Sequence, residues 1–244
     1  MVASAVSGAA VLAAQAAVAR ARRYARPELT MAMRATFGEG TGRPLRMVLL
    51  GDACALGVGV TRVEDSLAGQ LAELLAAAGG RVSLSSVAVA GARSADLATQ
   101  VARALVGPRP EVAIILVGTQ DATHLVPPSE AGAALAAAVH RLRDAGARIV
   151  VGTCPDLSAV RAMATPLRQV VGLLGRRIAR AQAASGRNAG ASVVDLAARV
   201  GPVFRADPGM FCHDEFHPSA DGYRVLAHAL FPEVAAAANL TVQA

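Results

Sequence analysis

The chain has 244 residues, of which 54% are hydrophobic and 3% aromatic, and its formal net charge is +6. This length suits a single α/β domain with a large core and a short extension. All 24 basic residues are arginine. They are scattered over expected helix faces without interleaved aromatic residues, which argues against nucleic acid as a partner. The lack of lysine and the Ala-rich composition are typical of a GC-rich, actinobacterial genome.

Cysteine spacing and glycine patterns exclude several classes of site. Cys54, Cys154 and Cys212 are too far apart for a zinc knuckle or a redox pair. The Gly-rich segment 51–60 lacks the Gly-Lys-Ser/Thr of a phosphate-binding loop and the third glycine of a dinucleotide fingerprint. We therefore expect no metal and no cofactor.

An Ala/Val-rich stretch at residues 2–19 precedes a cluster of arginines at 20, 22, 23 and 26. Three interpretations are open. The stretch is a membrane anchor whose basic side is cytoplasmic, a secretory signal that ends at the small residues 17–19, or an Ala-rich helix packed on the domain. The first two place the protein at the membrane or in the cell envelope rather than free in the cytoplasm. We assign residues 1–44 to a leader and linker, and residues 45–244 to one domain.

Strand-like and helix-like segments alternate after this leader. Apolar runs bounded by turn residues predict strands at 46–50, 82–89, 111–117, 147–152 and 191–195. Helical patterns occupy about 62–78, 94–106, 129–145, 165–185 and 219–236. Near-continuous hydrophobic strands are typical of parallel sheets that are buried on both faces. The sequence therefore predicts an α/β fold: a three-layer, doubly wound, five-stranded parallel sheet of flavodoxin-like order.

Three helix boundaries can also be predicted. Gly79-Gly80 and Gly146 fall where helix C-terminal caps are expected, and Pro218 falls at a plausible first helical turn. Ligands of such sheets bind at the carboxyl ends of the strands. The segments that follow the strands are therefore the candidates for function.

Four of these segments carry residues that suggest chemistry. Gly51-Asp52-Ala53-Cys54 follows the first strand, Gly91 lies after the second, and Gly118-Thr119-Gln120-Asp121 ends the third. Asp214 and His217 precede the last helix. A carboxylate three residues before a histidine can fix the imidazole tautomer and stabilise its cationic form.

In this order, over roughly residues 45–235, the segments resemble the signature blocks of the SGNH (GDSL-type) hydrolases. The resemblance implies metal-free hydrolysis of small-molecule esters, including acylated glycans or lipids. A serine attacks the carbonyl, a histidine takes its proton, and the oxyanion is held by backbone N–H groups and an asparagine. Asp214, His217 and Gly91 match this pattern, whereas Ala53 stands in place of the serine and Gln120 in place of the asparagine.

Ala53 has no oxygen with which to attack, so we expect the chain as written to be nearly inert toward simple esters. Three explanations are open. The chain is a natural degenerate member, a pseudoenzyme that keeps its cleft for binding, with the apolar leader as a membrane tether in one version. It is an engineered serine-to-alanine knockout. Or Cys54 or Ser94 has replaced the nucleophile, since a helix N-terminus lowers a thiol pKa, although Cys54 should point about 100° away from position 53.

Overall fold

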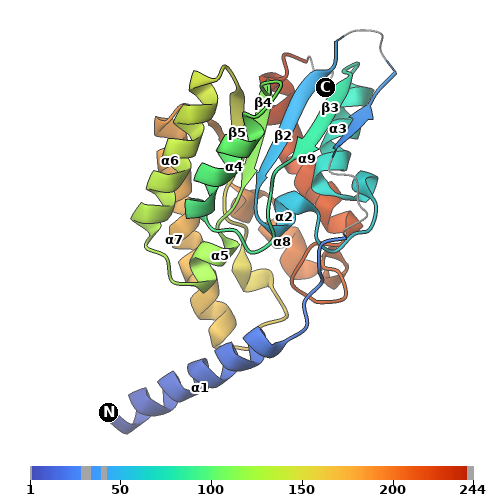
Figure 1. Ribbon diagram of the computed structural model, residues 1–244. Coiled ribbons are helices and arrows are strands. Elements are labelled where there is room, and N and C mark those ends of the chain that lie inside the picture. Colours follow the sequence, from blue (N-terminus) through green and yellow to red (C-terminus); the bar gives the residue numbers. More distant parts are fainter. Residues whose placement is uncertain (1, 29–33, 40–42, 241–244) are drawn as a thin grey trace.

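The computed structural model describes residues 2–28, 34–39 and 43–240. Its centre is a six-stranded sheet with helices on both sides, as Figure 1 shows. The strand order is β1-β3-β2-β4-β5-β6, and all pairs except β1–β3 are parallel. This arrangement confirms the doubly wound prediction. The strands are β1 (Arg34–Phe37), β2 (Leu45–Gly51), β3 (Val82–Ser86), β4 (Val112–Leu116), β5 (Arg148–Gly152) and β6 (Ser192–Val194).

The sixth strand corrects the expected count of five. β1 pairs with β3 in the antiparallel sense, at the edge of the sheet. It contains only four residues, which alternate between exposed and half-buried, so it has no apolar run that a sequence pattern could reveal. Residues 34–37, which the sequence assigned to the leader and linker, are thus part of the sheet.

All five expected helices are present, with shifted starts. The helices are α1 (Val2–Ala21), α2 (Ala53–Leu56), α3 (Leu67–Ala77), α4 (Leu97–Ala104), α5 (Thr119–Thr123), α6 (Pro128–Asp144), α7 (Leu167–Asn188), α8 (Leu196–Ala206) and α9 (Ala220–Ala237). α3 begins after 62 because Ser66 caps it, and α9 begins after Pro218 because Ser219 caps it. Gly79 and Gly146 follow helices with positive φ, as expected. α8 was not predicted.

The sheet separates two apolar layers. Met47 and Leu49 of β2 pack in a cluster with residues of α3 and α9, whereas Val48 and Leu50 pack in another with residues of α4 and α6. Successive side chains of a strand point to opposite faces. Because both faces of β2 are covered, its successive buried residues must all be apolar. Such a continuous apolar run could be recognised as a strand from the sequence alone.

Two buried glutamines hold the carboxyl ends of the strands. Gln100 of α4 accepts from the Gly51 N–H at 2.7 Å and donates to the Gly51 carbonyl at 2.9 Å. Gln182 of α7 donates to the Val117 carbonyl and accepts from the Cys154 N–H, both at 2.8 Å. Each amide binds one buried N–H and one buried carbonyl at, or just after, the last residues of β2, β4 and β5. The glutamines fix the edge of the sheet on which the candidate site is built.

The N-terminal helix α1 lies at the end of the molecule to which the strands' carboxyl ends lead (Figure 1). The Gln15 side chain donates to the Thr165 carbonyl at 2.7 Å and accepts from the Leu167 N–H at 3.0 Å. This contact with the start of α7 corresponds to the packed-helix interpretation. Within residues 2–28, 34–39 and 43–240, no helix has the length and apolar character needed to cross a membrane.

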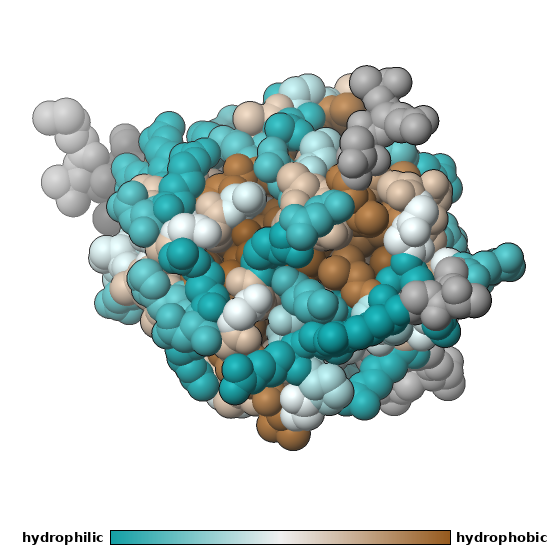
Figure 2. Space-filling model, turned by 90° about the horizontal axis from the view of Figure 1, so that it is seen from above, coloured by the Kyte–Doolittle hydropathy of each residue, from teal (hydrophilic) through white to brown (hydrophobic). Residues whose placement is uncertain are grey.

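The opposite end of the molecule has a mixed surface. Figure 2, seen from above, shows hydrophilic residues spread around this face, with apolar residues between them.

Replacing Gln182 with leucine should destabilise the protein strongly. The change leaves the Val117 carbonyl and the Cys154 N–H buried without their partner, at about 1–3 kcal/mol for each unsatisfied group. We expect the free energy of unfolding, measured by urea denaturation, to fall by about 2–4 kcal/mol. Gln169→Leu, an exposed change on the same helix, is the matched control. Equal small effects of the two changes would contradict this role.

Candidate active site

The turn between β2 and α2 has a backbone that only glycine allows. Gly51 has φ +134°, and a Cβ atom there would lie 1.6 Å from the Leu116 carbonyl oxygen. The next residue, Asp52, donates its N–H to that oxygen at 3.0 Å, and its carboxylate accepts from the Cys54 N–H at 3.0 Å. The aspartate thereby caps α2, so Ala53 is the first helical residue at the carboxyl edge of the sheet.

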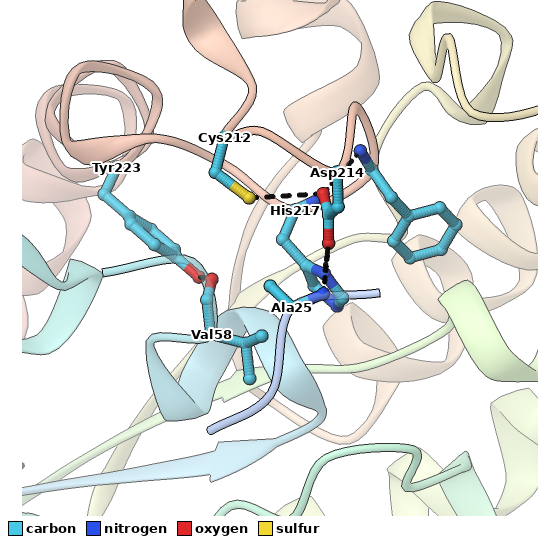
Figure 3. Close-up of polar contacts among 7 residues, drawn as sticks. Ala25, Val58, Cys212, Asp214, His217 and Tyr223 are labelled. Carbon is cyan, nitrogen blue, oxygen red and sulfur yellow. Dashed lines mark hydrogen bonds and ion pairs between the residues drawn. The ribbon is translucent and has the colours of Figure 1, made fainter. Parts of the chain in front are cut away.

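Asp214 and His217 form the carboxylate–imidazole pair that the sequence predicted. The Asp214 Oδ2 atom lies 2.7 Å from His217 Nδ1, as Figure 3 shows. The other carboxylate oxygen, Oδ1, accepts from the backbone N–H groups of Phe216 at 2.8 Å and His217 at 2.9 Å. Cys212 Sγ donates to the same oxygen at 3.2 Å. The loop therefore folds around one carboxylate.

Hydrogen bonds keep this carboxylate ionised. Burial alone would raise the pKa of Asp214, but donation from the His217 side chain and from the N–H groups of His217, Ala25 and Phe216 together lower it below its ordinary value. An ionised Asp214 can only accept, so His217 Nδ1 carries the proton of this contact. The unprotonated nitrogen of a neutral imidazole is then Nε2, as a general base requires.

Two cavities meet at this site. Ala53, Gln120 and His217 line both of them. The narrower cavity, of about 80 Å³, has apolar walls that include Leu157, Val160, Phe204 and Phe216. The wider one, of about 520 Å³, is also lined by Gly91. The structure thus brings Ala53, Gly91, Gln120 and His217 to a common space, with Asp214 behind the histidine.

The alternative nucleophiles are poorly placed. Burial, with a contribution from the Asp52 carboxylate, raises the pKa of the Cys54 thiol far above its ordinary value. The expected lowering by the helix N-terminus is therefore wrong, because α2 is short and Cys54 packs against the apolar core. Ser94 is buried, and its hydroxyl donates to Asp121 at 3.0 Å. These contacts oppose the reassigned-nucleophile explanation.

Asp52 is a buried carboxyl group with an unusual titration. Burial raises its pKa to about 6, and the opposing effects of the Cys54 N–H, His217 and the Thr119 hydroxyl are smaller. In the folded state the group therefore holds its proton at pH values where the unfolded chain has lost it. Sequence reasoning gave Asp52 no such property, because its burial depends on the surrounding strands.

Several residues at the site carried no sequence signal. Tyr223 is fully buried and donates its hydroxyl to the Val58 carbonyl at 2.6 Å, which ties α9 to the segment after α2 (Figure 3). Tyr24 and Ala25, in the segment predicted as a leader, line the wider cavity. Among the described residues, no group of three or more His, Cys, Asp or Glu side chains is placed to hold a metal ion.

Sequence and structure comparisons agree with this geometry. The profile of the GDSL-like lipase/acylhydrolase family matches residues 49–225, which is more than half of the chain. The chain belongs to this family. Its matched stretch is 40% identical over 190 residues to a GDSL-like esterase from Mycobacterium tuberculosis strain H37Rv, and covers 77% of this chain but only 60% of that relative.

Solved structures share the fold at low identity. A lipase/acylhydrolase from Enterococcus faecalis superposes with a TM-score of 0.65 at 20% identity, covering 82% of this chain and 99% of that one. An acetylxylan esterase from Geobacillus stearothermophilus, solved as a catalytic serine-to-alanine mutant, gives a TM-score of 0.59 at 21% identity, covering 81% and 95%. These likenesses show that the architecture is that of SGNH hydrolases.

Asp52→Asn should make stability less dependent on pH. The pKa of Asp52 is raised from 3.8 to about 6 in the folded state. The folded state therefore gains stability from holding this proton, and this gain is fully present below pH 3.8 and is lost as the pH rises through 6. A shift of this size corresponds to about 3 kcal/mol. We therefore expect the stability of Asp52→Asn relative to the parent to rise between pH 4 and pH 7, as measured by chemical denaturation at each pH.

Asp144→Asn, at an exposed position on α6, is the control and should follow the parent across this pH range. If Asp52→Asn also follows the parent, the carboxyl group does not titrate abnormally in the folded protein.

Proposed function

We propose that this cleft is a serine ester hydrolase site whose nucleophile position is occupied by Ala53. The observation that carries the proposal is the common cavity lined by Ala53, Gln120 and His217, with the Asp214–His217 contact of 2.7 Å behind it. Membership of the GDSL-like family and the esterase named among its relatives support the reaction class. The substrates are small-molecule esters, with acylated glycans or lipids as the candidates.

The geometry supports a division of roles. With a serine at position 53, His217 Nε2 would take the hydroxyl proton as the oxygen attacks the ester carbonyl, and Asp214 would stabilise the imidazolium. The oxyanion would lie near Gly91 and Gln120, which line the wider cavity together with position 53. Glutamine keeps the amide donor but is one methylene longer than asparagine, so its contribution to oxyanion binding is smaller.

As written, the chain lacks the attacking oxygen. Removing the serine of such a site costs about 10⁶-fold in turnover, and the histidine and oxyanion donors alone leave little activity. We therefore propose that this chain is inactive or nearly so toward esters. A methyl group at position 53 with the cavities intact also favours a second candidate, a non-catalytic protein that binds acyl or acylated glycan ligands.

Ala53→Ser should restore turnover. We expect hydrolysis of p-nitrophenyl acetate and butyrate to rise by about 10³-fold over the parent, less than full recovery because one oxyanion donor is worth about 10²–10³-fold. Ala53→Ser with Gln120→Asn should be faster still. The kcat/KM of each purified variant is the measurement.

Cys54→Ser is the matched control, one residue away. Its hydroxyl should bring no gain, because Cys54 packs against the core rather than standing in for a nucleophile. If Ala53→Ser folds but stays as inactive as the parent, the hydrolase proposal fails and the binding role takes its place. Activity in the parent that Cys54→Ala abolishes would overturn the assignment of position 53.

A further inference from the structure

The segment after α1 contacts the Asp214 carboxylate directly. We call residues 22–25 the N-terminal strap. The Ala25 N–H donates to Asp214 Oδ2 at 2.9 Å, and this is the oxygen that faces His217 Nδ1 at 2.7 Å (Figure 3). A residue some 190 positions away in the sequence thus supplies one of the hydrogen bonds that lower the pKa of Asp214. The N-terminal strap acts on the oxygen that orients the histidine.

Tyr24 packs against the imidazole itself. Its ring meets the His217 ring edge-on, with centroids 6.4 Å apart and an interplanar angle of 88°. It meets the Phe216 ring at 5.1 Å and 62°. Contacts of this kind limit rotation of the imidazole, because aromatic rings in T-shaped pairs favour one relative orientation. Burial also raises the pKa of the Tyr24 hydroxyl above its ordinary value.

Further contacts hold the start of the N-terminal strap and the helix that precedes it. Arg22 forms an ion pair of 2.6 Å with Glu215, the residue that follows Asp214. Before the strap, Gln15 of α1 makes two hydrogen bonds with residues 165 and 167 at the start of α7. Glu215 itself has φ +59°, a conformation that is uncommon for residues other than glycine. These contacts join the N-terminal segment to the loop that carries the catalytic pair.

The same segment builds one wall of the wider cavity. Ala16, Ala19 and Arg20 of α1 line it together with Tyr24 and Ala25. Ala53, Gly91 and Gln120, the positions at which an ester would react, line the same cavity. Residues of α1 and of the N-terminal strap therefore border the same cavity as position 53.

We infer that the N-terminal strap is a positioning element of the active site rather than a dispensable leader. The Ala25 N–H and the Tyr24 ring hold the Asp214–His217 pair, and α1 forms one wall of the wider cavity. The reaction that the positioned pair would catalyse rests on the proposed function, whereas the positioning of Asp214 and His217 by the N-terminal strap does not. Ala25 acts through Asp214, and Tyr24 acts through His217 while its ring also lines the wider cavity.

The decisive variant is Ala25→Pro, because proline lacks the N–H that Asp214 accepts. Ala25→Gly is the matched control and keeps that N–H. In the chain as it stands, the His217 Nδ1 proton should give a hydrogen-bonded proton NMR signal far downfield. We expect its exchange with water to be at least about tenfold faster in Ala25→Pro, as for the loss of one charge-assisted hydrogen bond, and unchanged in Ala25→Gly.

The role of Tyr24 is tested by the same exchange measurement on two variants, one that removes the ring and one that keeps it. Tyr24→Ala should accelerate exchange of that proton, and Tyr24→Phe, which keeps the ring, should restore the parent rate. Thermal denaturation of each variant checks that it is folded. Unchanged exchange in folded Ala25→Pro and Tyr24→Ala would overturn the inference, as would equal acceleration in Ala25→Gly.

Kinetics in an Ala53→Ser background separate this inference from the proposed function. There, Ala25→Pro should lower kcat about tenfold with KM little changed, since it disturbs the catalytic pair. Tyr24→Ala should in addition raise KM, since the ring lines the wider cavity. If Ala53→Ser is inactive while the NMR result holds, the hydrolase proposal fails and the positioning role stands. An unchanged kcat in active Ala53→Ser/Ala25→Pro would contradict the positioning role.

Discussion

The Asp214 carboxylate is the group on which the arrangement of the site depends. It accepts from the His217 ring and from the N–H groups of Ala25, Phe216 and His217, as well as from the Cys212 thiol. A buried carboxylate is costly unless it is fully hydrogen-bonded. This one side chain therefore joins the N-terminal strap to the loop before α9 and orients the histidine ring of that loop.

The sheet provides the fixed frame for this carboxylate. Where β2, β4 and β5 end, their backbone groups are buried and need partners. Gln100 and Gln182 supply them from α4 and α7. Position 53 lies just after the end of β2 that Gln100 holds, and Gln120 lies a few residues after the end of β4 that Gln182 holds. The rigidity of the site is thus set by interactions that do not touch a substrate.

The sequence predicted the parts of the fold that follow periodic rules. Continuous apolar segments such as 46–50 predicted strands buried on both faces, and the spacing of Asp214 and His217 predicted a carboxylate–imidazole pair within one loop. It could not reveal β1, whose four residues alternate weakly, or the glutamine clamps, because a glutamine in a helix looks like any surface residue. The N-terminal strap could not be predicted for another reason: its partner lies about 190 residues away, and the Ala/Val-rich stretch at residues 2–19 before it also fits a leader. The lowered pKa expected for Cys54 was wrong because burial outweighs the helix terminus.

The most direct test of the account is covalent trapping at position 53. The parent and Ala53→Ser would be treated with a fluorophosphonate, which phosphonylates an activated serine, and the modified residue mapped by mass spectrometry. We expect stoichiometric labelling of Ala53→Ser at residue 53, none in the parent, and loss of the labelling when His217 is changed to alanine. Labelling of the parent at another residue, or a folded Ala53→Ser that remains unlabelled, would contradict the claim that position 53 is the nucleophile position of a serine ester hydrolase site.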